Sequence, residues 1–476
     1  MNDAEPGAKS AEGGNAARLR ADALEIWHAG VRAVDSARLV RQAVSVVGNQ
    51  LFVCGERIDL GRTGWIAVVG AGKAGAGMAA GLLEALGPKI VAEKHVAGWL
   101  NVPADCVRTL PPIRLHAARS AGSNEPTAAG VAGAEAILSL AGLLLPSDLC
   151  FCLISGGASA LLPAPAEGIT LADKLTVTRH LSAAGANIVE LNTVRKQLSR
   201  IKGGGLARAC RAGRLMTLII SDVIGDPLDV IASGPTVADT TTADDALAVL
   251  EKYDARQVAP SVFAYLERRR ASTEGTRFAR QTVALDACTN LVIGNNAVAV
   301  CAAEVEARRR GYTPDVRHAR ELEGLAEDVG MSFANAALRM RDADGPDCLI
   351  SGGEPVVKLA PLARRGHGGR NQQLALAALQ SFEKAGCDRI ALVAGGTDGE
   401  DGPTDAAGAV VDAEIVASAR RLKFDPAGYL ARNDAYHFFE PLGGLLKTGP
   451  THTNVCDVRV VVVGRDRSRT SPREAV

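Results

Sequence analysis

Short apolar runs alternate along the chain with longer stretches in which apolar residues recur at helical spacing. The runs end at glycine or serine, which is typical of buried strands that lead into loops. The clearest helical spacing covers residues 16–47. Strands are expected at 65–69, 89–92, 113–117, 149–154, 215–220, 291–293, 348–350, 390–393 and 458–463. Strands that alternate with helices in this way predict an α/β fold with mostly parallel sheets.

The pattern divides into two halves. Periodicity lapses over the polar stretch 271–282, and a chain of 476 residues exceeds the usual size of one domain, about 100–200 residues. We therefore predict two α/β domains, a Rossmann-like one over 16–270 and a second one over 283–463.

One five-residue motif, Leu-Ile-Ser-Gly-Gly, occurs in each half, at 153–157 and at 349–353. Both copies end an apolar run, and ligands of open α/β sheets bind beyond the carboxyl ends of strands. The repeat therefore suggests a site in a cleft between the two domains, although a common strand-to-turn solution would look the same. The binding candidates from this motif are Ser155, Gly156, Gly157, Ser351, Gly352 and Gly353.

Composition narrows the class of protein. Lys and Arg total 53, as do Asp and Glu, and a net charge of zero argues against a general nucleic-acid binder. No run of about 18 apolar residues predicts a membrane helix, and no signal peptide is evident. The ten cysteines form no C-x-x-C pair, which favours reduced thiols and a cytoplasmic protein. Glycine is in excess, at 51 residues, and much of the excess lies in the candidate ligand loops described next.

The first of these loops, Gly70–Gly75, follows a predicted strand and matches the dinucleotide fingerprint G-x-G-x-x-G through Gly70, Gly72 and Gly75. Glu93 stands near the position of a ribose-binding acid, so an NAD enzyme is a real alternative. Lys73 inside the turn instead suits the negative charge that develops on a transferring phosphoryl group. The P-loop is excluded, because Ala67 and Ala74 occupy positions where it requires Gly and Ser or Thr.

Two polar positions stand out in the middle of the chain. Asp222 follows the apolar run that ends at Ile220, where a carboxylate can hold Mg²⁺ or accept a proton from a substrate hydroxyl. Lys196 lies off the apolar stripe of a predicted helix and could reach a phosphate or a carboxylate.

Three further loops lie in the second half. Arg370 follows three glycines, and its fork of donors suits phosphate or carboxylate. Thr397 and Asp398 follow a predicted strand in an acidic turn that could bind a divalent cation, with Glu354 as a second acid. Thr451 and Asn454 offer a hydroxyl and an amide to phosphate oxygens. A solvated turn is an equally good interpretation of the last two loops.

These segments occur in the order found in a known family. From about residue 20 to 463 the chain resembles the two-domain glycerate 2-kinases, whose C-terminal part is the MOFRL domain. The resemblance implies ATP-dependent phosphorylation of D-glycerate to 2-phosphoglycerate with Mg²⁺, in a cleft between two α/β domains. It implies catalytic roles for Lys73, Arg370 and Asp222, and it places Glu354 and Asp398 as acids near the nucleotide. Asp222 and Asp398 are the expected metal ligands, and the protein is expected as a monomer or homodimer.

Two positions depart from the family pattern. The region 122–127 keeps only a glycine and a proline of G-H-P-x-P-D, and His452 stands where members often carry glycine. The alternative function is an NAD(P)H-dependent hydroxypyruvate reductase, which rests on Gly70–Gly75 and Glu93.

Overall fold

The computed structural model describes residues 7–465 apart from 121, 123–124, 272–285 and 322. The chain forms two compact units. The N-terminal unit comprises Asp35–Asn295 with His452–Asn454. The C-terminal unit comprises Asn296–Thr451 and the chain from Val455, together with the residues up to Val34. Within the described residues, no helix is both long enough and apolar enough to cross a membrane.

The N-terminal unit contains a six-stranded sheet in which every neighbouring pair is parallel. Its order is β6-β5-β4-β7-β8-β9, which is the 3-2-1-4-5-6 order of the Rossmann fold. The strands are β4 Ile66–Ala71, β5 Ala97–Pro103, β6 Ile113–Arg119, β7 Leu149–Ile154, β8 Arg214–Ile220 and β9 Cys288–Gly294. The order reverses between β4 and β7, so the loops after these two strands form the edge of the sheet where ligands bind.

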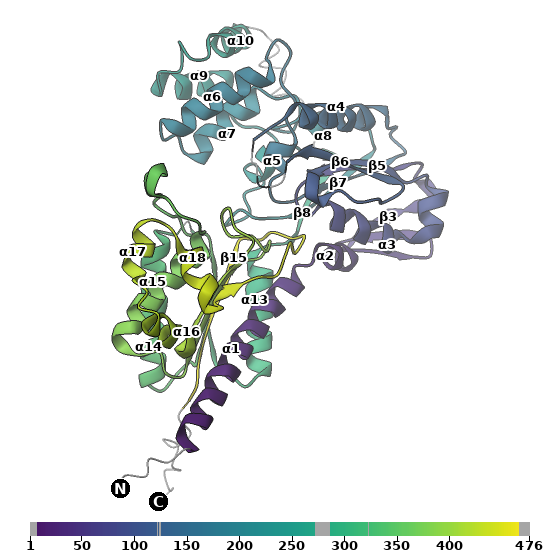
Figure 1. The fold of residues 1–476 in the computed structure, drawn as a ribbon. Helices are drawn as coiled ribbons and strands as arrows, with labels where there is room; N and C mark the ends of the chain where they lie inside the picture. Colours follow the sequence, from purple (N-terminus) through teal and green to yellow (C-terminus); the bar gives the residue numbers. More distant parts are fainter. Residues whose placement is uncertain (1–6, 121, 123–124, 272–285, 322, 466–476) are drawn as a thin grey trace, which may run out of the picture. The chain divides into compact units, whose positions relative to one another are not determined.

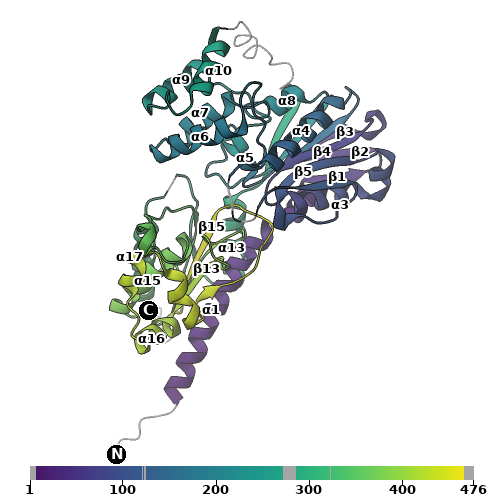
Figure 2. The ribbon, with the colours of Figure 1, turned by 45° about the horizontal axis from the view of Figure 1, so that its top comes forward.

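Helices pack around this sheet and also form a group of their own. The helices nearest the sheet are α2 Ser36–Ala43, α3 Gly75–Glu93, α4 Ala128–Leu143, α5 Ala158–Leu161 and α8 Gly205–Ala209. A second group has a separate apolar core that includes Val177, Leu250 and Phe263. This group contains α6 Leu171–Ala183, α7 Ile188–Gln197, α9 Ala243–Lys252 and α10 Pro260–Ala271 (Figures 1 and 2). A small antiparallel sheet consists of β1 Val44–Val47, β2 Gln50–Val53 and β3 Glu56–Asp59.

The C-terminal unit has a mixed sheet of order β10-β11-β15-β12-β13-β14. Only the pair β10 and β11 is parallel among its described pairs. Its strands are β10 Pro314–Arg317, β11 Cys348–Gly353, β12 Ile390–Gly396, β13 Gly408–Asp412, β14 Leu445–Leu446 and β15 Asp457–Val463. The two-unit α/β architecture is therefore confirmed, and the parallel pairing that the sequence predicts extends through the N-terminal sheet but not through this one.

Helices cover both faces of the C-terminal sheet (Figure 1). One face carries α1 Gly7–Ala33 and α13 Asn296–Arg309, and the Trp27 indole of α1 donates to the carbonyls of Gly395 and Val458. The other face carries α14 Ala326–Asp342 and α15 Arg370–Ala385. Side chains of β15 alternate between these faces, so Val461 and Val463 enter the core under α14 and α15. Three shorter helices complete the unit: α16 Ala413–Arg421, α17 Pro426–Ala431 and α18 Ala435–Phe439.

Several expected elements differ from the structure. The helix predicted over 16–47 is two helices and a strand, because the Asp35 side chain accepts the Arg38 N–H and starts α2. The strand predicted at 89–92 lies in the last part of α3, because a run of three apolar residues after Lys89 does not distinguish a strand from a buried helical turn. The true strand, β5, begins at Ala97.

The unit boundaries also differ from the predicted domains 16–270 and 283–463. Residues up to Val34 belong to the C-terminal unit because α1 packs on α13 and the sheet there. Strand β9 belongs to the N-terminal unit because it extends the sheet beside β8. Most of the predicted boundary 271–282 lies outside the described residues.

Candidate active site

The loops after β4 and β7 lie against each other at the point where the strand order reverses. Gly70 has φ +149°, and a Cβ there would lie 2.0 Å from the Leu153 carbonyl oxygen. Gly72 has φ +144°, and its Cβ would lie 2.0 Å from Ser155 Oγ. Both positions therefore require glycine, for conformation and for space.

The backbone of the Gly70–Gly75 turn is satisfied within the protein. The Lys73 N–H donates to the Gly156 carbonyl at 2.9 Å, and the Gly75 N–H donates to that of Gly72 at 3.1 Å. The Ala74 N–H donates to Ser155 Oγ at 3.0 Å. In a dinucleotide site such N–H groups point at the pyrophosphate. Here three of these N–H groups are bonded within the protein, and the side chain of Lys73 is the charged group of the turn.

Two basic side chains flank Gly157, which has φ +80°. A Cβ at Gly157 would lie 3.9 Å from Lys73 Cγ and 3.1 Å from an Nη atom of Arg119. Arg119 ends β6 and is only 4% exposed. The sequence pattern does not single out Arg119, whose only signal is a charge two residues beyond the strand predicted at 113–117.

Asp222 and Asn454 meet beside Gly156. The Asn454 Nδ2 donates to Asp222 Oδ2 at 3.4 Å. A Cβ at Gly156 would lie 2.5 Å from the same oxygen and 2.9 Å from Asn454 Nδ2. The N-terminal unit thus brings together four predicted residues, Lys73, Gly156, Asp222 and Asn454.

The segment His452–Asn454 reaches this unit through an unusual backbone. His452 has φ +57°, a conformation that glycine adopts without strain. Its carbonyl accepts the Ser36 hydroxyl at 3.0 Å. This conformation explains why glycine suits the position that His452 occupies.

Arg370 opens α15 in the C-terminal unit and is clamped by two acids. Its Nε and one Nη contact the carboxylate of Asp457 at 2.8 and 3.0 Å, and the other Nη contacts Glu354 Oε1 at 2.7 Å. Burial alone would lower the pKa of the guanidinium, but Asp457 and Glu354 outweigh this effect and raise it. Arg370 is thus a cation within a group whose net charge is negative.

Asp457 is a contact that sequence analysis missed. It is fully buried at the first position of β15. In the sequence it directly precedes the apolar run that predicts this strand. Only its charge at the start of an otherwise apolar run could have marked it. A Cβ at Gly396 would lie 3.1 Å from Asp398 Oδ1 and 3.6 Å from Asp457 Oδ1, so these two carboxylates flank the same glycine.

The Thr397–Asp398 turn is tied to the chain that precedes β15. The Thr397 hydroxyl donates to the Cys456 carbonyl at 2.7 Å and accepts the Val455 N–H at 2.8 Å. The Thr451 hydroxyl donates to the Thr397 carbonyl at 2.5 Å. Thr397 and Thr451 therefore support the turn that presents Asp398.

Asp401 is a second carboxylate that sequence analysis missed. It is 2% exposed and accepts the N–H groups of Asn371 and Gln372 at 3.0 and 2.8 Å, so it caps the helix that begins with Arg370. Burial raises the pKa of Asp401 to about 7, although these two N–H groups act in the opposite direction. A Cβ at Gly369 would lie 2.3 Å from Asp401, so the two glycine-rich loops interlock.

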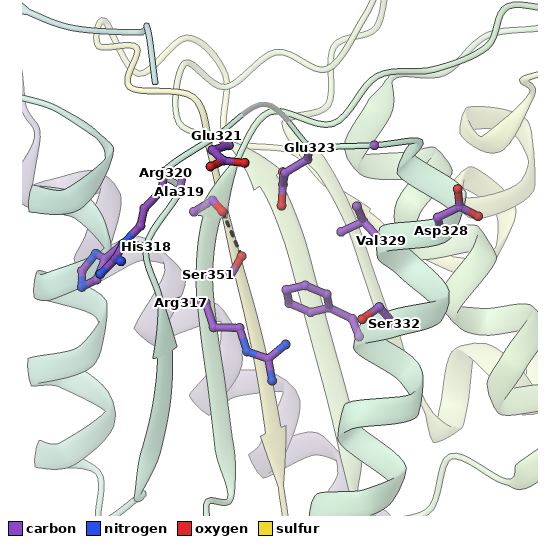
Figure 3. A pocket seen from close by; sticks show the side chains of 13 residues that line it. Arg317, His318, Ala319, Arg320, Glu321, Glu323, Asp328, Val329, Ser332 and Ser351 are labelled. Atoms are coloured by element: carbon purple, nitrogen blue, oxygen red, sulfur yellow. Dashed lines mark hydrogen bonds between the residues drawn. The ribbon is translucent and has the colours of Figure 1, made fainter. Parts of the chain in front are cut away.

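Ser351 and Gly352 line a pocket of about 380 Å³ at the carboxyl ends of β10 and β11 (Figure 3). Glu323 lies over the strand ends, and Ser332 projects from α14 (Figure 3). Behind the pocket, Arg459 pairs with Glu323 at 2.6 and 2.7 Å, and a Cβ at Gly353 would collide with that pair.

Lys196 has a different environment from the one expected. Its side chain is 4% exposed, and its ammonium contacts Asp229 at 3.2 Å and Asp239 at 3.9 Å. Two carboxylates therefore already engage the charge that was expected to meet a ligand.

Each unit, taken by itself, contains a strand-end carboxylate with the chemistry of a Mg²⁺ ligand. No three His, Cys, Asp or Glu side chains form a preformed metal cage in the part of the chain that the structure describes. Mg²⁺ is commonly held by one or two carboxylates together with substrate phosphates, so no such cage is required. Asp222 and Asp398, which both follow strand ends, fit this mode of binding.

Comparisons with known proteins agree with this geometry. Residues 22–267 match a family described as a domain of unknown function (DUF4147), and residues 347–457 match the MOFRL family. The glycerate 2-kinase of Pyrococcus horikoshii is 35% identical, over 95% of this chain and 99% of its own. A putative hydroxypyruvate reductase of Agrobacterium vitis is 38% identical, over 83% of this chain and 99% of its own. The crystal structure of a glycerate kinase from Thermotoga maritima superposes with a TM-score of 0.77 at 32% identity, covering 94% of this chain and all of that one.

Proposed function

Because the chain belongs to the glycerate kinase family, we propose that it transfers the γ-phosphoryl group of ATP to D-glycerate and forms 2-phosphoglycerate. The observation that carries this proposal is the meeting of Lys73, Asp222 and Asn454 around Gly156, at the strand reversal of a Rossmann-like sheet. This arrangement offers a cation and a carboxylate at the usual ligand-binding edge.

In this mechanism Asp222 orients the C2 hydroxyl of glycerate and accepts its proton. The hydroxyl oxygen forms a bond to the γ-phosphorus while the bond from that phosphorus to the bridging oxygen of ATP breaks, and ADP leaves. Lys73 and Arg119 stabilise the charge on the moving phosphoryl group. Arg370, aimed by Asp457 and Glu354, contributes its remaining N–H donors to the same charge.

Mg²⁺, when bound, would neutralise the β- and γ-phosphate oxygens, with Asp222 and Asp398 as its carboxylate ligands. The pocket of about 380 Å³ beside Ser351 and Gly352 falls within the size range of ligand sites, about 300–1,000 Å³. We assign this pocket to the nucleotide, with Glu354, which follows the strand end at Gly353, and Thr397 as further candidate contacts. None of the ten cysteines forms a disulfide in the structure, which supports a cytoplasmic reaction.

The reductase alternative has less support. A ribose-binding acid belongs at the end of the second strand of such a sheet, whereas Glu93 ends helix α3 and pairs with Lys89 at 3.8 Å. The turn amides that would bind a pyrophosphate are bonded internally. The name of the Agrobacterium relative nevertheless keeps a direct test worthwhile.

One pair of assays separates the two functions. ADP release should depend on D-glycerate and Mg²⁺, and ³¹P NMR of the product should show 2-phosphoglycerate. NADH should not be consumed with hydroxypyruvate when no coupling enzyme is present. NADH oxidation without ADP release would overturn the proposal, and 3-phosphoglycerate as product would correct the phosphorylated position.

A further inference from the structure

Three basic residues of the N-terminal unit lie close enough to repel one another, and no carboxylate in the described part of the chain forms an ion pair with them. Lys174 on α6 and Lys202 before α8 are 7% and 4% exposed. Lys174 Nζ donates to the Leu198 carbonyl at 2.9 Å. Lys202 Nζ donates to the carbonyl and hydroxyl of Ser159 at 2.8 and 2.6 Å and to the Ser233 hydroxyl at 3.3 Å. Among the described residues, no acid forms an ion pair with Lys174, Lys202 or Arg195.

This arrangement is electrostatically incomplete. Burial, together with Lys174 and Arg195, lowers the pKa of Lys202 well below its usual range. Burial and Arg195 lower the pKa of Lys174 to about 7. Asp229 and Asp239, the acids near α7, are engaged by Lys196. A buried charge is stable when it is paired, so an anion beside these residues would supply the missing partner.

The polar groups around Lys202 are held in place by strained backbone. Ser159 Oγ lies 3.1 Å from Ser233 Oγ, which donates to Asn192 Oδ1 at 3.1 Å. Ala232 and Ser233 both have positive φ, +53° and +61°. Consecutive non-glycine residues in this conformation cost free energy and mark sites that the surrounding structure holds in place. The N–H of Gly203 donates to the Ser233 carbonyl at 3.0 Å and fixes this loop.

The cluster formed by Lys174, Lys202 and Arg195 lies next to the proposed site of phosphoryl transfer. Ser159 is on α5, two residues beyond Gly157, which Lys73 and Arg119 flank. Arg195 and Ser159 are both partly exposed, whereas Lys202, whose Nζ contacts the Ser159 hydroxyl, is buried.

We infer that Arg195 and Ser159, backed by Lys202, bind the carboxylate group of the acceptor substrate. The inference rests on the proposed function and adds to it the residues that select a carboxylate-bearing alcohol. Arg195 supplies a planar fork of donors that matches a carboxylate. The Ser159 hydroxyl, which accepts a hydrogen bond from Lys202 Nζ, can turn its own hydrogen from Ser233 Oγ to a carboxylate oxygen.

The test compares Arg195→Met with wild-type enzyme in steady-state kinetics. Loss of a charged hydrogen-bonded contact should raise the KM for D-glycerate about 10- to 100-fold and leave the KM for ATP within about threefold. Arg200→Met is the matched control, because Arg200 lies in the same segment but is paired with Glu135. It should leave both constants near wild type. An unchanged KM for glycerate in Arg195→Met would overturn the inference, as would a rise confined to ATP.

Calorimetry gives a readout that does not depend on turnover. Titration of D-glycerate into the enzyme should give a Kd that is about 10- to 100-fold higher for Arg195→Met than for wild type or Arg200→Met. Thermal unfolding checks the fold of each variant. An equal Kd for all three proteins would contradict the assignment.

The two proposals can fail separately. If wild-type enzyme phosphorylates glycerate but Arg195→Met binds it equally well, only the carboxylate site is wrong. If wild-type enzyme neither binds nor phosphorylates glycerate, the proposed function fails as well. If inorganic phosphate binds in an Arg195-dependent manner and glycerate does not, the group is a phosphate site.

Discussion

The same five residues, Leu-Ile-Ser-Gly-Gly, end a strand in each unit, yet the two copies have different surroundings. After β7, Ser155 accepts the Ala74 N–H, and Gly157 turns into α5 beside Lys73 and Arg119. After β11, the Ser351 hydroxyl donates to the Gly352 carbonyl, and the chain leads to Glu354.

The first copy thus lies beside two cations and one carboxylate, Asp222, whereas the second leads into a cluster in which Glu354 and Asp457 outnumber Arg370. The local motif supplies a close backbone turn in both cases. Neighbouring strands decide the charge beside it, and the two units therefore suit different parts of a phosphoryl transfer reaction. Four substitutions test this contrast.

The largest effect is expected at Lys73. Its turn is held by backbone hydrogen bonds that do not depend on the side chain, so Lys73→Ala should fold normally. Removal of a charge that acts mainly in the transition state should lower kcat by about 10²–10³-fold. Steady-state kinetics would measure this, with Lys89→Ala, an exposed lysine on the adjacent α3, as the control. A kcat within a few-fold of wild type would remove Lys73 from the mechanism.

Arg370 should differ from Lys73, because its loss damages the fold as well. Arg370→Met leaves Asp457 buried without its cation, which should cost about 3 kcal/mol of unfolding free energy. The double variant Arg370→Met/Asp457→Asn should recover part of that stability but not kcat. Urea unfolding and kinetics on the three variants would show this. Equal stability of Arg370→Met and wild type would mean that the clamp is not structural.

Asp401 should give the C-terminal unit a distinctive pH dependence. Its pKa in the folded state, about 7, lies above its unfolded value, so its contribution to stability is present at low pH and is lost as pH rises toward 7. Wild type should therefore lose roughly 2–3 kcal/mol between pH 5 and pH 8 relative to Asp401→Asn, by the usual 1.36 kcal/mol per pKa unit.

Urea unfolding at several pH values measures this difference. Asp412→Asn is the matched control, because Asp412 caps α16 while paired with Arg20. It should retain the pH dependence of wild type. A wild-type profile parallel to that of Asp401→Asn would show that Asp401 is already ionised at pH 5.

The smallest effect is expected at His452, in the short segment that the C-terminal part of the chain contributes to the N-terminal unit. His452→Gly relieves a positive φ of +57° and keeps the carbonyl that accepts the Ser36 hydroxyl. Relief of this strain should raise the free energy of unfolding by roughly 0.5–1 kcal/mol. The extra conformational entropy of glycine in the unfolded chain should offset part of that gain. A thermal melt would detect this, and a clear loss of stability would show that the imidazole makes a contact of its own.

The sequence determined the features that depend on local chemistry. Apolar runs that end at glycine located most of the strands, and the strand-end loops identified Lys73, Asp222 and Arg370 as candidates. It could not place 89–92 in a helix, because such a short apolar run suits either element. The predicted domains also assigned α1 to the N-terminal half of the chain. The structure places it in the C-terminal unit, because α1 packs on α13 and so links residues nearly three hundred positions apart.

Only the tertiary structure decided the partners of these residues. Asp457 clamps Arg370 across 87 positions, and Asn454 meets Asp222 across 232. Lys196 and Lys202 lie six residues apart and look alike in the sequence, yet one is neutralised by Asp229 and Asp239, while the other has only neutral hydrogen-bond partners. The physical reason is that a loop's conformation follows from nearby residues, whereas the charge and burial around a side chain follow from whichever distant strands and helices pack against it.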